Sequence, residues 1–167
     1  MVLNRFLYKI RFKKVKFFNP ALTEVQKNVE IGEGTRVGSL SLIQKNVRIG
    51  KNCTIGSQCN ICSDVQIGDN VSIQTGCHIT RGVKIGSGTF VGPGVITMND
   101  KFIDGKIEPP IIGNNCRIGG GSCILPAITI GNNVFVGSGS VVTKSIEDGL
   151  KVYGNPAKSV KNRNTVD

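Results

Sequence analysis

The feature that most constrains the fold of this 167-residue chain is an apolar position that recurs every sixth residue. Valine or isoleucine occupies this anchor position from residue 25 to residue 91, and again from residue 112 to residue 142. A period of six fits neither the 3.6-residue repeat of an α-helix nor the alternation of a hairpin sheet. It fits a short strand followed by a turn, and three such units make one triangular coil. The 18 anchors are Val25, Ile31, Val37, Ile43, Ile49, Ile55, Ile61, Ile67, Ile73, Ile79, Ile85, Val91, Ile112, Ile118, Ile124, Ile130, Val136 and Val142.

The residues around the anchors favour stacked coils. Glycine follows the anchor in 11 of the 18 units, which we interpret as tolerance of turn dihedrals that a Cβ atom would resist. The fourth residue after each anchor is small or β-branched, as expected at a narrow inward-facing corner. With coils stacked at a strand spacing of about 4.8 Å, the repeat predicts an all-β parallel β-helix of about six coils over residues 25–147. Residues 1–24 would form an N-terminal cap and residues 148–167 a C-terminal tail.

Composition agrees with this prediction and narrows the possible ligands. The chain has 22 glycines and 5% aromatic residues, which is typical of short strands joined by tight turns. The formal charge of +10 favours an anionic ligand such as nucleotide phosphates. Nucleic acid is not expected, because no RNA-binding motif, zinc finger or helix-turn-helix pattern is present.

The cysteines and the histidine argue against a metal site. Four of the six cysteines, Cys53, Cys59, Cys77 and Cys116, occupy the inward fourth position, where cysteine acts as a small apolar residue. The one C-x-x-C pair has no second pair to complete a zinc site. We therefore expect free thiols and no metal. The single histidine, His78, excludes a three-histidine catalytic metal site like that of the γ-type carbonic anhydrases.

Residues 97–111 interrupt the repeat, and the length of this stretch is not a multiple of six. The insertion cannot lie within the coils, so we expect it to loop outward. It is polar and rigid in composition, and a loop on a rigid scaffold is where functional residues usually lie. A surface loop without function is the alternative.

The repeats "IGKNCT", "IGDNVS" and "IGNNVF" resemble those of the hexapeptide-repeat acyltransferases, over residues 25 to 157. The segments "FVGPGVITMNDKF" and "VYGNPAK" are similar to those of the nucleotide-sugar N-acetyltransferases, which acetylate UDP- or dTDP-linked amino sugars. This resemblance implies a left-handed β-helix and a homotrimer with active sites between subunits, where the loop of one subunit reaches over a neighbour. It also implies acetyl-CoA along the later coils and a role in surface glycan synthesis, such as lipopolysaccharide biosynthesis.

The resemblance assigns Asn99 to a place beside the sugar amine. Asp100 either fixes the loop or takes the amine proton. His78 lies one coil beneath the last residues before the loop, as a catalytic base or a lining residue. The chain departs from the family at Lys101, where an arginine is common nearby, and at Arg81, where an aspartate is common. We take Arg81 and Lys101 as candidate substrate-binding residues.

Candidate cofactor-binding residues follow the loop. Glycines there would allow close approach to the pantetheine arm of acetyl-CoA, and lysines could meet its phosphates. The alternative is that these residues are ordinary turn glycines and surface lysines. The candidates are Gly119, Gly120, Gly121, Gly137, Ser138, Lys144 and Lys158.

The chemistry favours transfer to nitrogen. A sugar amine is partly neutral near pH 7 and can attack a thioester directly, so positioning supplies much of the rate. A hydroxyl is hardly ionised and needs a general base, usually histidine. We therefore predict an acetyl-CoA-dependent N-acetyltransferase. An O-acetyltransferase using His78 on a sugar or polysaccharide is the first alternative, and a non-catalytic binding scaffold is the second.

The N-terminal segment, residues 1–17, combines apolar residues roughly on one helical face with six basic residues. It either caps the first coil or associates peripherally with an anionic membrane surface. No apolar run reaches the roughly 20 residues of a membrane span, and no cleavage site is recognisable. We expect a cytoplasmic protein. The apolar residues of the segment are Leu3, Phe6, Leu7, Ile10 and Phe17.

Overall fold

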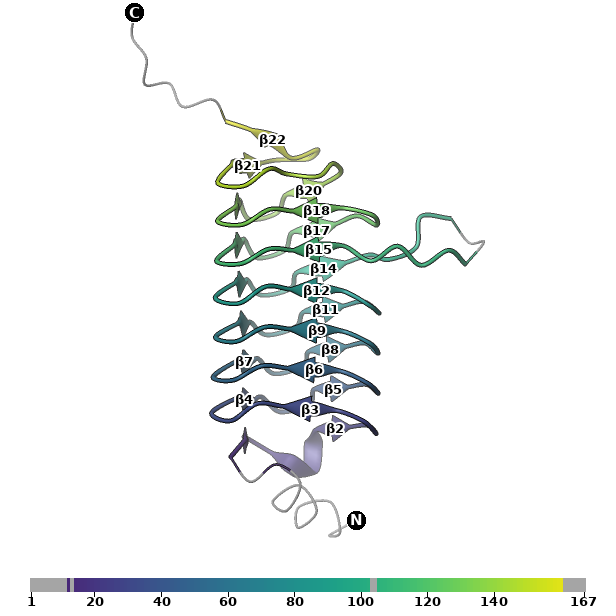
Figure 1. Ribbon diagram of the computed structural model, residues 1–167, viewed down its shortest axis with the longest axis vertical. Helices are drawn as coiled ribbons and strands as arrows, with labels where there is room; N and C mark the ends of the chain where they lie inside the picture. The colour runs from purple at the N-terminus through teal and green to yellow at the C-terminus, as the bar shows by residue number, and fades with distance from the viewer. Residues whose placement is uncertain (1–11, 13, 103–104, 161–167) are drawn as a thin grey trace, which may run out of the picture.

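The computed structural model describes residues 12, 14–102 and 105–160. Over these residues the chain winds into a column of stacked coils, with one arm standing out from its side (Figure 1). Each of the three faces of the column is a sheet of short strands, nearly all of them two residues long. The predicted all-β, left-handed parallel β-helix is therefore confirmed.

We call the three faces sheets A, B and C. Sheet A contains β1 (Lys16–Phe17), β4 (Arg36–Val37), β7 (Thr54–Ile55), β10 (Ser72–Ile73), β13 (Phe90–Val91), β16 (Arg117–Ile118), β19 (Phe135–Val136), β21 (Lys151–Tyr153) and β22 (Lys158–Ser159). Sheet B contains β2 (Glu24–Val25), β5 (Leu42–Ile43), β8 (Asn60–Ile61), β11 (His78–Ile79), β14 (Ile96–Thr97), β17 (Cys123–Ile124) and β20 (Val141–Val142). Sheet C contains β3 (Glu30–Ile31), β6 (Arg48–Ile49), β9 (Gln66–Ile67), β12 (Lys84–Ile85), β15 (Ile111–Ile112) and β18 (Thr129–Ile130).

The anchors stack into three apolar ladders that form the core. Strands pair in parallel with partners three repeat units away, as in the pairing of Ile55 with Ile73. Every anchor from Val37 to Val142 is buried, and full burial of one such side chain contributes about 2 kcal/mol. Four fourth-position hydroxyls donate to a main-chain carbonyl of the next coil, as Thr35 Oγ1 does to the Gly50 oxygen at 2.9 Å; the others are those of Ser41, Thr89 and Ser122. Small residues are therefore selected there for room and for hydrogen bonding.

The column has about eight turns, not six. Six complete coils run from β2 to β19, and sheet A gains a further parallel strand at each end, β1 and β21. These end coils do not keep the three-unit spacing: Phe17 pairs with Val37, and Val136 pairs with Val152. A search for strict periodicity therefore misses them.

The glycine after the anchor has a different role from the one expected. Positive φ occurs three positions after the anchor, for example at Asn52 (φ 54) and Gly76 (φ 73), and not at Gly68. A Cβ atom at Gly68 would lie 2.7 Å from the main-chain nitrogen of Ser87 in the coil above. Glycine is thus needed after the anchor for close stacking of coils, while the left-handed turn falls two positions later.

The start of the described chain covers the first coil. Phe12 is buried and its ring lies 5.7 Å from that of Phe17. Phe17 belongs to strand β1, so the expected helical face does not extend to it. The short 3-10 helix η1 (Pro20–Leu22) follows, and the Asn19 side chain accepts a hydrogen bond from its Ala21 amide. Residues 1–11 and 13, which carry most of the predicted amphipathic face, lie outside the described residues.

Candidate active site

The described part of the insertion, residues 98–102 and 105–110, forms an arm between β14 and β15, at the corner where sheet B leads into sheet C (Figure 1). Ile85 pairs with Ile67 in the coil below and with Ile112 in the coil above, and the connection to the coil above is longer by nine positions. The two sides of the arm pair through an antiparallel bridge between Asp100 and Ile107. The outward loop predicted over residues 97–111 is confirmed, but Thr97 and Ile111 at its ends remain in strands.

Thr97 occupies an anchor position that the sequence analysis left out because it is neither valine nor isoleucine. Its side chain is fully buried. The chain begins to leave sheet B here, and the Thr80 amide donates to Thr97 Oγ1 at 2.8 Å instead of to a main-chain carbonyl. The two hydroxyls of Thr80 and Thr97 also bond, at 2.9 Å. The hydroxyl of Thr97 therefore replaces a hydrogen bond lost where the arm departs.

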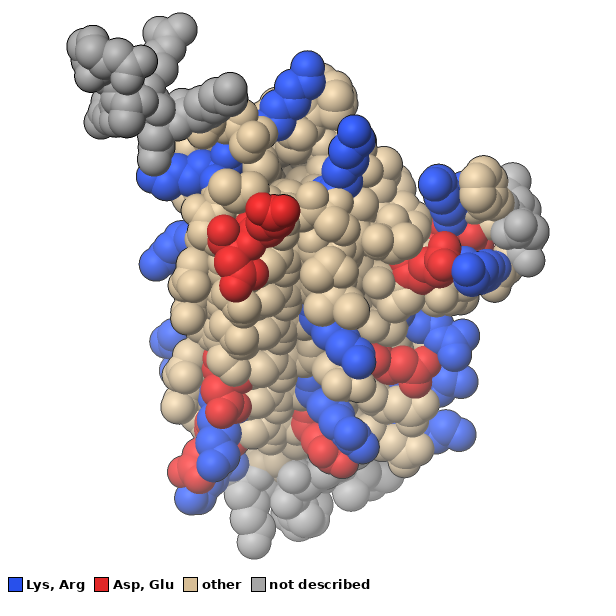
Figure 2. Space-filling model, turned by 45° about the horizontal axis from the view of Figure 1, so that its top comes forward, with Lys and Arg blue, Asp and Glu red and all other residues tan. Residues whose placement is uncertain are grey.

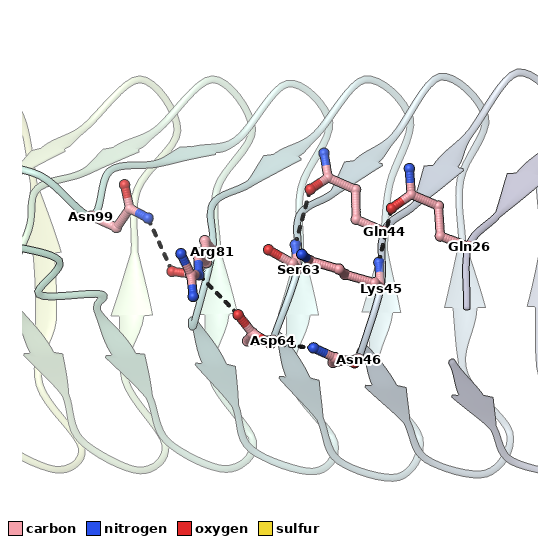
Figure 3. A network of polar contacts seen from close by, with 8 residues as sticks. All are labelled: Gln26, Gln44, Lys45, Asn46, Ser63, Asp64, Arg81 and Asn99. Carbon is pink, nitrogen blue, oxygen red and sulfur yellow. Dashed lines mark hydrogen bonds and ion pairs between the residues drawn. The ribbon is translucent and has the colours of Figure 1, made fainter. Parts of the chain in front are cut away.

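Asn99 lies at the base of the arm and is tied to the coil beneath. Its Nδ2 donates to the main-chain oxygen of Arg81 at 3.1 Å. Arg81 Nε in turn contacts Asp64 Oδ2 at 2.8 Å, and Asn46 donates to the other carboxylate oxygen of Asp64 at 3.0 Å. Figure 3 shows this line of contacts running along the corner from the arm toward the N-terminal coils. These contacts bring the candidates Asn99 and Arg81 together.

Asp100 and Lys101 lie farther out on the arm. Asp100 Oδ1 accepts a hydrogen bond from the Phe102 amide at 3.0 Å, so its carboxylate holds the local turn. Lys101 is exposed, with its Nζ 5.7 Å from the centre of the Phe102 ring. Near the root, Glu108 pairs with Lys106 and its main-chain oxygen accepts from the Ala127 amide at 2.7 Å. Figure 2 shows charged side chains of both signs gathered on the arm.

His78 lies on the outward side of sheet B, half-buried, and pairs in register with Asn60 below and Ile96 above. Its Nε2 is 3.9 Å from the sulfur of Cys62, and Gln44 donates to Asn60 Oδ1 at 3.4 Å. Within the described chain no carboxylate is recorded against its ring. A histidine that acts as a general base is usually oriented by such a partner, and for His78 the recorded ring contact is the Cys62 sulfur.

The outward side of sheet B differs from the other two faces. Sheet A carries charged residues such as Arg36 and Arg117, and sheet C carries Arg48 and Lys84. In the described sheet B strands above Glu24, none of the outward residues is charged. These residues are Leu42, Asn60, His78, Ile96, Cys123 and Val141.

The candidate cofactor glycines lie at the corner between sheets A and B, above the level of the arm. Gly119 stacks so closely that an added Cβ would collide with the main chain of Ser138, and at Gly137 it would collide with the Tyr153 ring. Gly121 has φ 68 and faces open space. Coil stacking explains Gly119 and Gly137, and an added Cβ at Gly120 would lie 3.0 Å from the Pro93 oxygen, so of these four glycines Gly121 alone faces open space.

The two candidate lysines lie near the end of the column. Lys144 and Lys158 are both exposed. Lys158 belongs to β22, which runs antiparallel to β21 and pairs Lys158 with Tyr153. Lys144 follows β20 at the corner between sheets B and C, two coils above the arm, whereas Lys158 lies on sheet A.

All six cysteines are free thiols, as expected. Four of them donate to main-chain carbonyls of the next coil; Cys116, for example, bonds to the Gly131 oxygen at 3.0 Å. Burial raises the pKa of the Cys53 and Cys116 thiols. These cysteines therefore act as the serines and threonines do at the same position. Among the described residues, no group of three or more His, Cys, Asp or Glu side chains could hold a metal ion.

Two residues of this site were missed by sequence reasoning. The signal for Thr97 was its place six positions after Val91. The signal for Asp64 was the corner series Asn28, Asn46, Asp64, each one coil after the last, in which only the third member is acidic.

The fold and the arm define a hexapeptide-repeat β-helix protein with one inserted loop. The family described as bacterial transferase hexapeptide (six repeats) matches residues 28–63, 64–97 and 109–144, which is more than half of the chain. The chain belongs to this family. No curated protein sequence matches it significantly. In the described part of the chain, no helix is long and apolar enough to cross a membrane.

Solved structures share the fold at low sequence identity. The acetyltransferase domain of PglB from Neisseria gonorrhoeae, in complex with acetyl coenzyme A, matches with a TM-score of 0.62 and 23% identity, covering 88% of this chain and 58% of that one. This chain thus spans little more than half of that neighbour. UDP-N-acetylglucosamine O-acyltransferase (LpxA) from Moraxella catarrhalis matches with a TM-score of 0.65 and 22% identity over 89% of this chain and 70% of that one.

A third structure is a point mutant of AntD, an N-acyltransferase from Bacillus cereus, in complex with dTDP-4-amino-4,6-dideoxyglucose and coenzyme A. It matches with a TM-score of 0.63 and 19% identity, covering 94% of this chain and 87% of that one.

Proposed function

We propose that this chain is an acetyl-CoA-dependent N-acetyltransferase acting on the amino group of a nucleotide-linked amino sugar in surface glycan biosynthesis. The observation that carries the proposal is the arm, whose base fixes Asn99 against Arg81, three residues along the chain from the half-buried His78. Family membership supports a transferase. Two fold neighbours are N-acyl- or acetyltransferases solved with coenzyme A or acetyl-CoA, and one of them also holds a nucleotide-linked amino sugar.

The proposed reaction needs little acid–base chemistry from the protein. The neutral amine attacks the thioester carbon, and the coenzyme A thiolate leaves as the tetrahedral intermediate collapses. Asn99 would position the amine, and the proton leaves to solvent or to a nearby side chain such as Asp100 or His78. Positioning of this kind can supply a large part of the rate. The Gly121 amide already donates to the Pro93 oxygen at 2.8 Å, so the main-chain amide of Gly120 is the proposed donor for the pantetheine arm and the developing oxyanion.

We propose a homotrimer with sites between subunits. Each copy carries a formal charge of +10, so copies that approach through charged faces would repel. Sheet B is uncharged above Glu24, and Ile96 on it is 45% exposed. The arm begins at the edge of this sheet and exposes Phe102 and Ile107, which fits contact with a neighbouring copy.

The surroundings of His78 favour nitrogen over oxygen as the acceptor. Transfer to a hydroxyl needs a general base, and the recorded ring contact of His78 is a thiol sulfur, not a carboxylate. O-acetylation remains the second candidate, because LpxA shares the fold and is an O-acyltransferase.

The test is a screen of UDP- and dTDP-linked amino sugars with acetyl-CoA, following release of free thiol. The product is then treated with hydroxylamine, which cleaves acetyl esters and leaves acetamides intact. We expect a hydroxylamine-stable product, with strong loss of turnover in N99A and a smaller loss in H78A. A labile product, or loss in H78A with N99A spared, would establish O-transfer.

Calorimetric measurement of acetyl-CoA binding distinguishes the two enzyme hypotheses, N-acetyltransferase and O-acetyltransferase, from the non-catalytic binding scaffold. We expect acetyl-CoA to bind the full-length protein with one site per chain. Absence of acetyl-CoA binding, together with no thiol release across the sugar panel, would favour a scaffold that only binds partners.

A further inference from the structure

The corner beneath the arm holds an arginine whose position is set by several contacts. Arg81 follows β11, its main-chain oxygen accepts from Asn99 at 3.1 Å, and its Nε bonds to Asp64 at 2.8 Å. Among the described residues these are its recorded polar partners, so its two terminal nitrogens have none. The Arg81 side chain is 62% exposed.

Asp64 is itself fixed by the residues below it. Asn46 donates to Asp64 Oδ1 at 3.0 Å, and Asn28 donates to Asn46 Oδ1 at 3.2 Å. Both carboxylate oxygens of Asp64 are therefore engaged, and the bonds from Asn46 and Arg81 lower its pKa. Asn28, Asn46 and Asp64 occupy the same corner position in successive coils, each with positive φ.

The choice of aspartate at residue 64 is not explained by the backbone. Asparagine serves this left-handed position at residues 28 and 46 and is the residue that tolerates it best after glycine. Of these three corner positions, the one occupied by aspartate is the one that has Arg81 in the coil above it. An ordinary surface ion pair contributes little to stability, so the pair is better explained by what it does to the guanidinium.

We propose that Arg81, held in place by Asp64, is the anion-recognising group of the acceptor site and binds a pair of anionic oxygens on the substrate. This inference rests on the proposed function and names the chemistry of its acceptor. With Nε committed to Asp64, the two terminal nitrogens are presented together, which suits a phosphate or a carboxylate. Lys45, on the same corner, adds positive charge near Asp64 (Figure 3).

Two sources could supply such oxygens: the diphosphate of the nucleotide or a carboxylate on the sugar. Calorimetry on the full-length protein uses UDP and pyrophosphate as phosphate probes and glucuronic acid as the carboxylate probe. We expect one class to bind at least tenfold more weakly to R81Q than to the unchanged protein. The class that responds identifies the source.

The matched controls use a second exposed ion pair. Arg48 pairs with Glu30 at 3.7 Å on sheet C, so R48Q makes the same change in net charge away from the arm. We expect R48Q to bind the probes like the unchanged protein. D64N keeps a residue that suits the corner and removes only the charge that holds Arg81, so we expect it to raise KM for the acceptor severalfold with little change in kcat.

The outcomes separate this inference from the proposed function. If R81Q and R48Q lose probe binding equally, the loss is explained by the lower net charge of both variants, and the inference is overturned. Unchanged probe binding and acceptor KM in R81Q would overturn it as well, even if amino-sugar acetylation is found. Weaker probe binding in R81Q alone would support it, even if no acetyl transfer were detected.

Discussion

At the scale of single residues, the column depends on which side chain faces the core and on which backbone group it must satisfy. Most anchors need only apolar bulk, and isoleucine and valine supply it. Thr97 needs a hydroxyl as well, because the chain turns away from sheet B there and the Thr80 amide would lose its acceptor. The threonine that interrupts the series of valine and isoleucine anchors therefore supplies the hydrogen-bond acceptor that the main chain no longer provides there.

This role of Thr97 gives the first prediction. T97V restores the apolar ladder but leaves the half-buried Thr80 amide without its acceptor, which costs about 1 kcal/mol. We expect a lower midpoint of urea unfolding. The control is V91T, which makes the reverse exchange at a regular anchor and should also destabilise, since it buries a hydroxyl with no such partner. A T97V protein more stable than the unchanged one would contradict this account.

Two neighbouring glycines give the second prediction, because they are needed for different reasons. A Cβ at Gly68 would press on the main chain of Ser87, whereas Gly76 has φ 73 and open space around it. We expect G68A to lose about 2 kcal/mol or more through overpacking and G76A about 1 kcal/mol through its left-handed backbone. Denaturant titration measures both, and the opposite order would refute the stacking explanation.

Much at this scale could be predicted from the sequence. The ladder and the inward cysteines follow from a six-residue count. The bond from Asn99 to Arg81 and the pairing of Arg81 with Asp64 could not be predicted. The six-residue repeat tells which residues lie in the same coil, but it does not tell which long side chains reach from one coil to the next. The role of glycine was mistaken because the repeat does not reveal which turn residue has positive φ.

At the scale of elements, the arm is the one described insertion that does not contribute to the stack. It lengthens the connection between strands that otherwise keep their register. At its root Asn99 bonds to Arg81 and the Glu108 oxygen accepts from the Ala127 amide, but farther out its described residues bond within the arm, through the Asp100–Ile107 bridge and the Lys106–Glu108 ion pair. We therefore expect the column not to depend on it for folding.

Removal of the arm tests this separation. Deleting residues 100–108 restores the six-residue count between Thr97 and Ile112. We expect circular dichroism melting to change by only a few degrees, while acetyl transfer falls below detection. Retained transfer would mean that the arm is ordinary surface loop, and an unfolded product would mean that it supports the column.

The existence of the arm could be predicted because the interruption of the repeat, residues 97–111, is not a whole number of six-residue units long and so cannot be wound into the coils. Its contents could be matched to a family segment, but its direction could not. The arm points outward from the corner between sheets B and C, where it leaves the column. The number of repeat units that precede the arm determines which corner this is.

At the scale of the whole molecule, charge is distributed unevenly among the three faces. Sheets A and C carry charged outward residues, while sheet B is uncharged above Glu24. A strongly basic chain can associate with copies of itself most readily through such a face, because no like charges are brought together there.

The proposed assembly predicts a mass of three chains of 17.8 kDa each in light scattering. I96K places a charge on the outward side of sheet B and should shift the protein to monomers. T54K places the same charge on the outward side of sheet A and should leave the trimer intact. A monomeric unchanged protein, or dissociation by T54K alone, would exclude sheet B as the contact.

The stacking in coils of three units also bears on how such a chain can change during evolution. Each coil contacts mainly the coils directly above and below it. A whole coil can therefore be gained or lost near the N-terminal end, and the protein grows taller or shorter while the groups around the arm keep their places. A single residue inserted within a two-residue strand has no such neutral outcome, because it would move the anchor of that strand off its ladder; extra residues at a corner, as in the arm, leave the register intact.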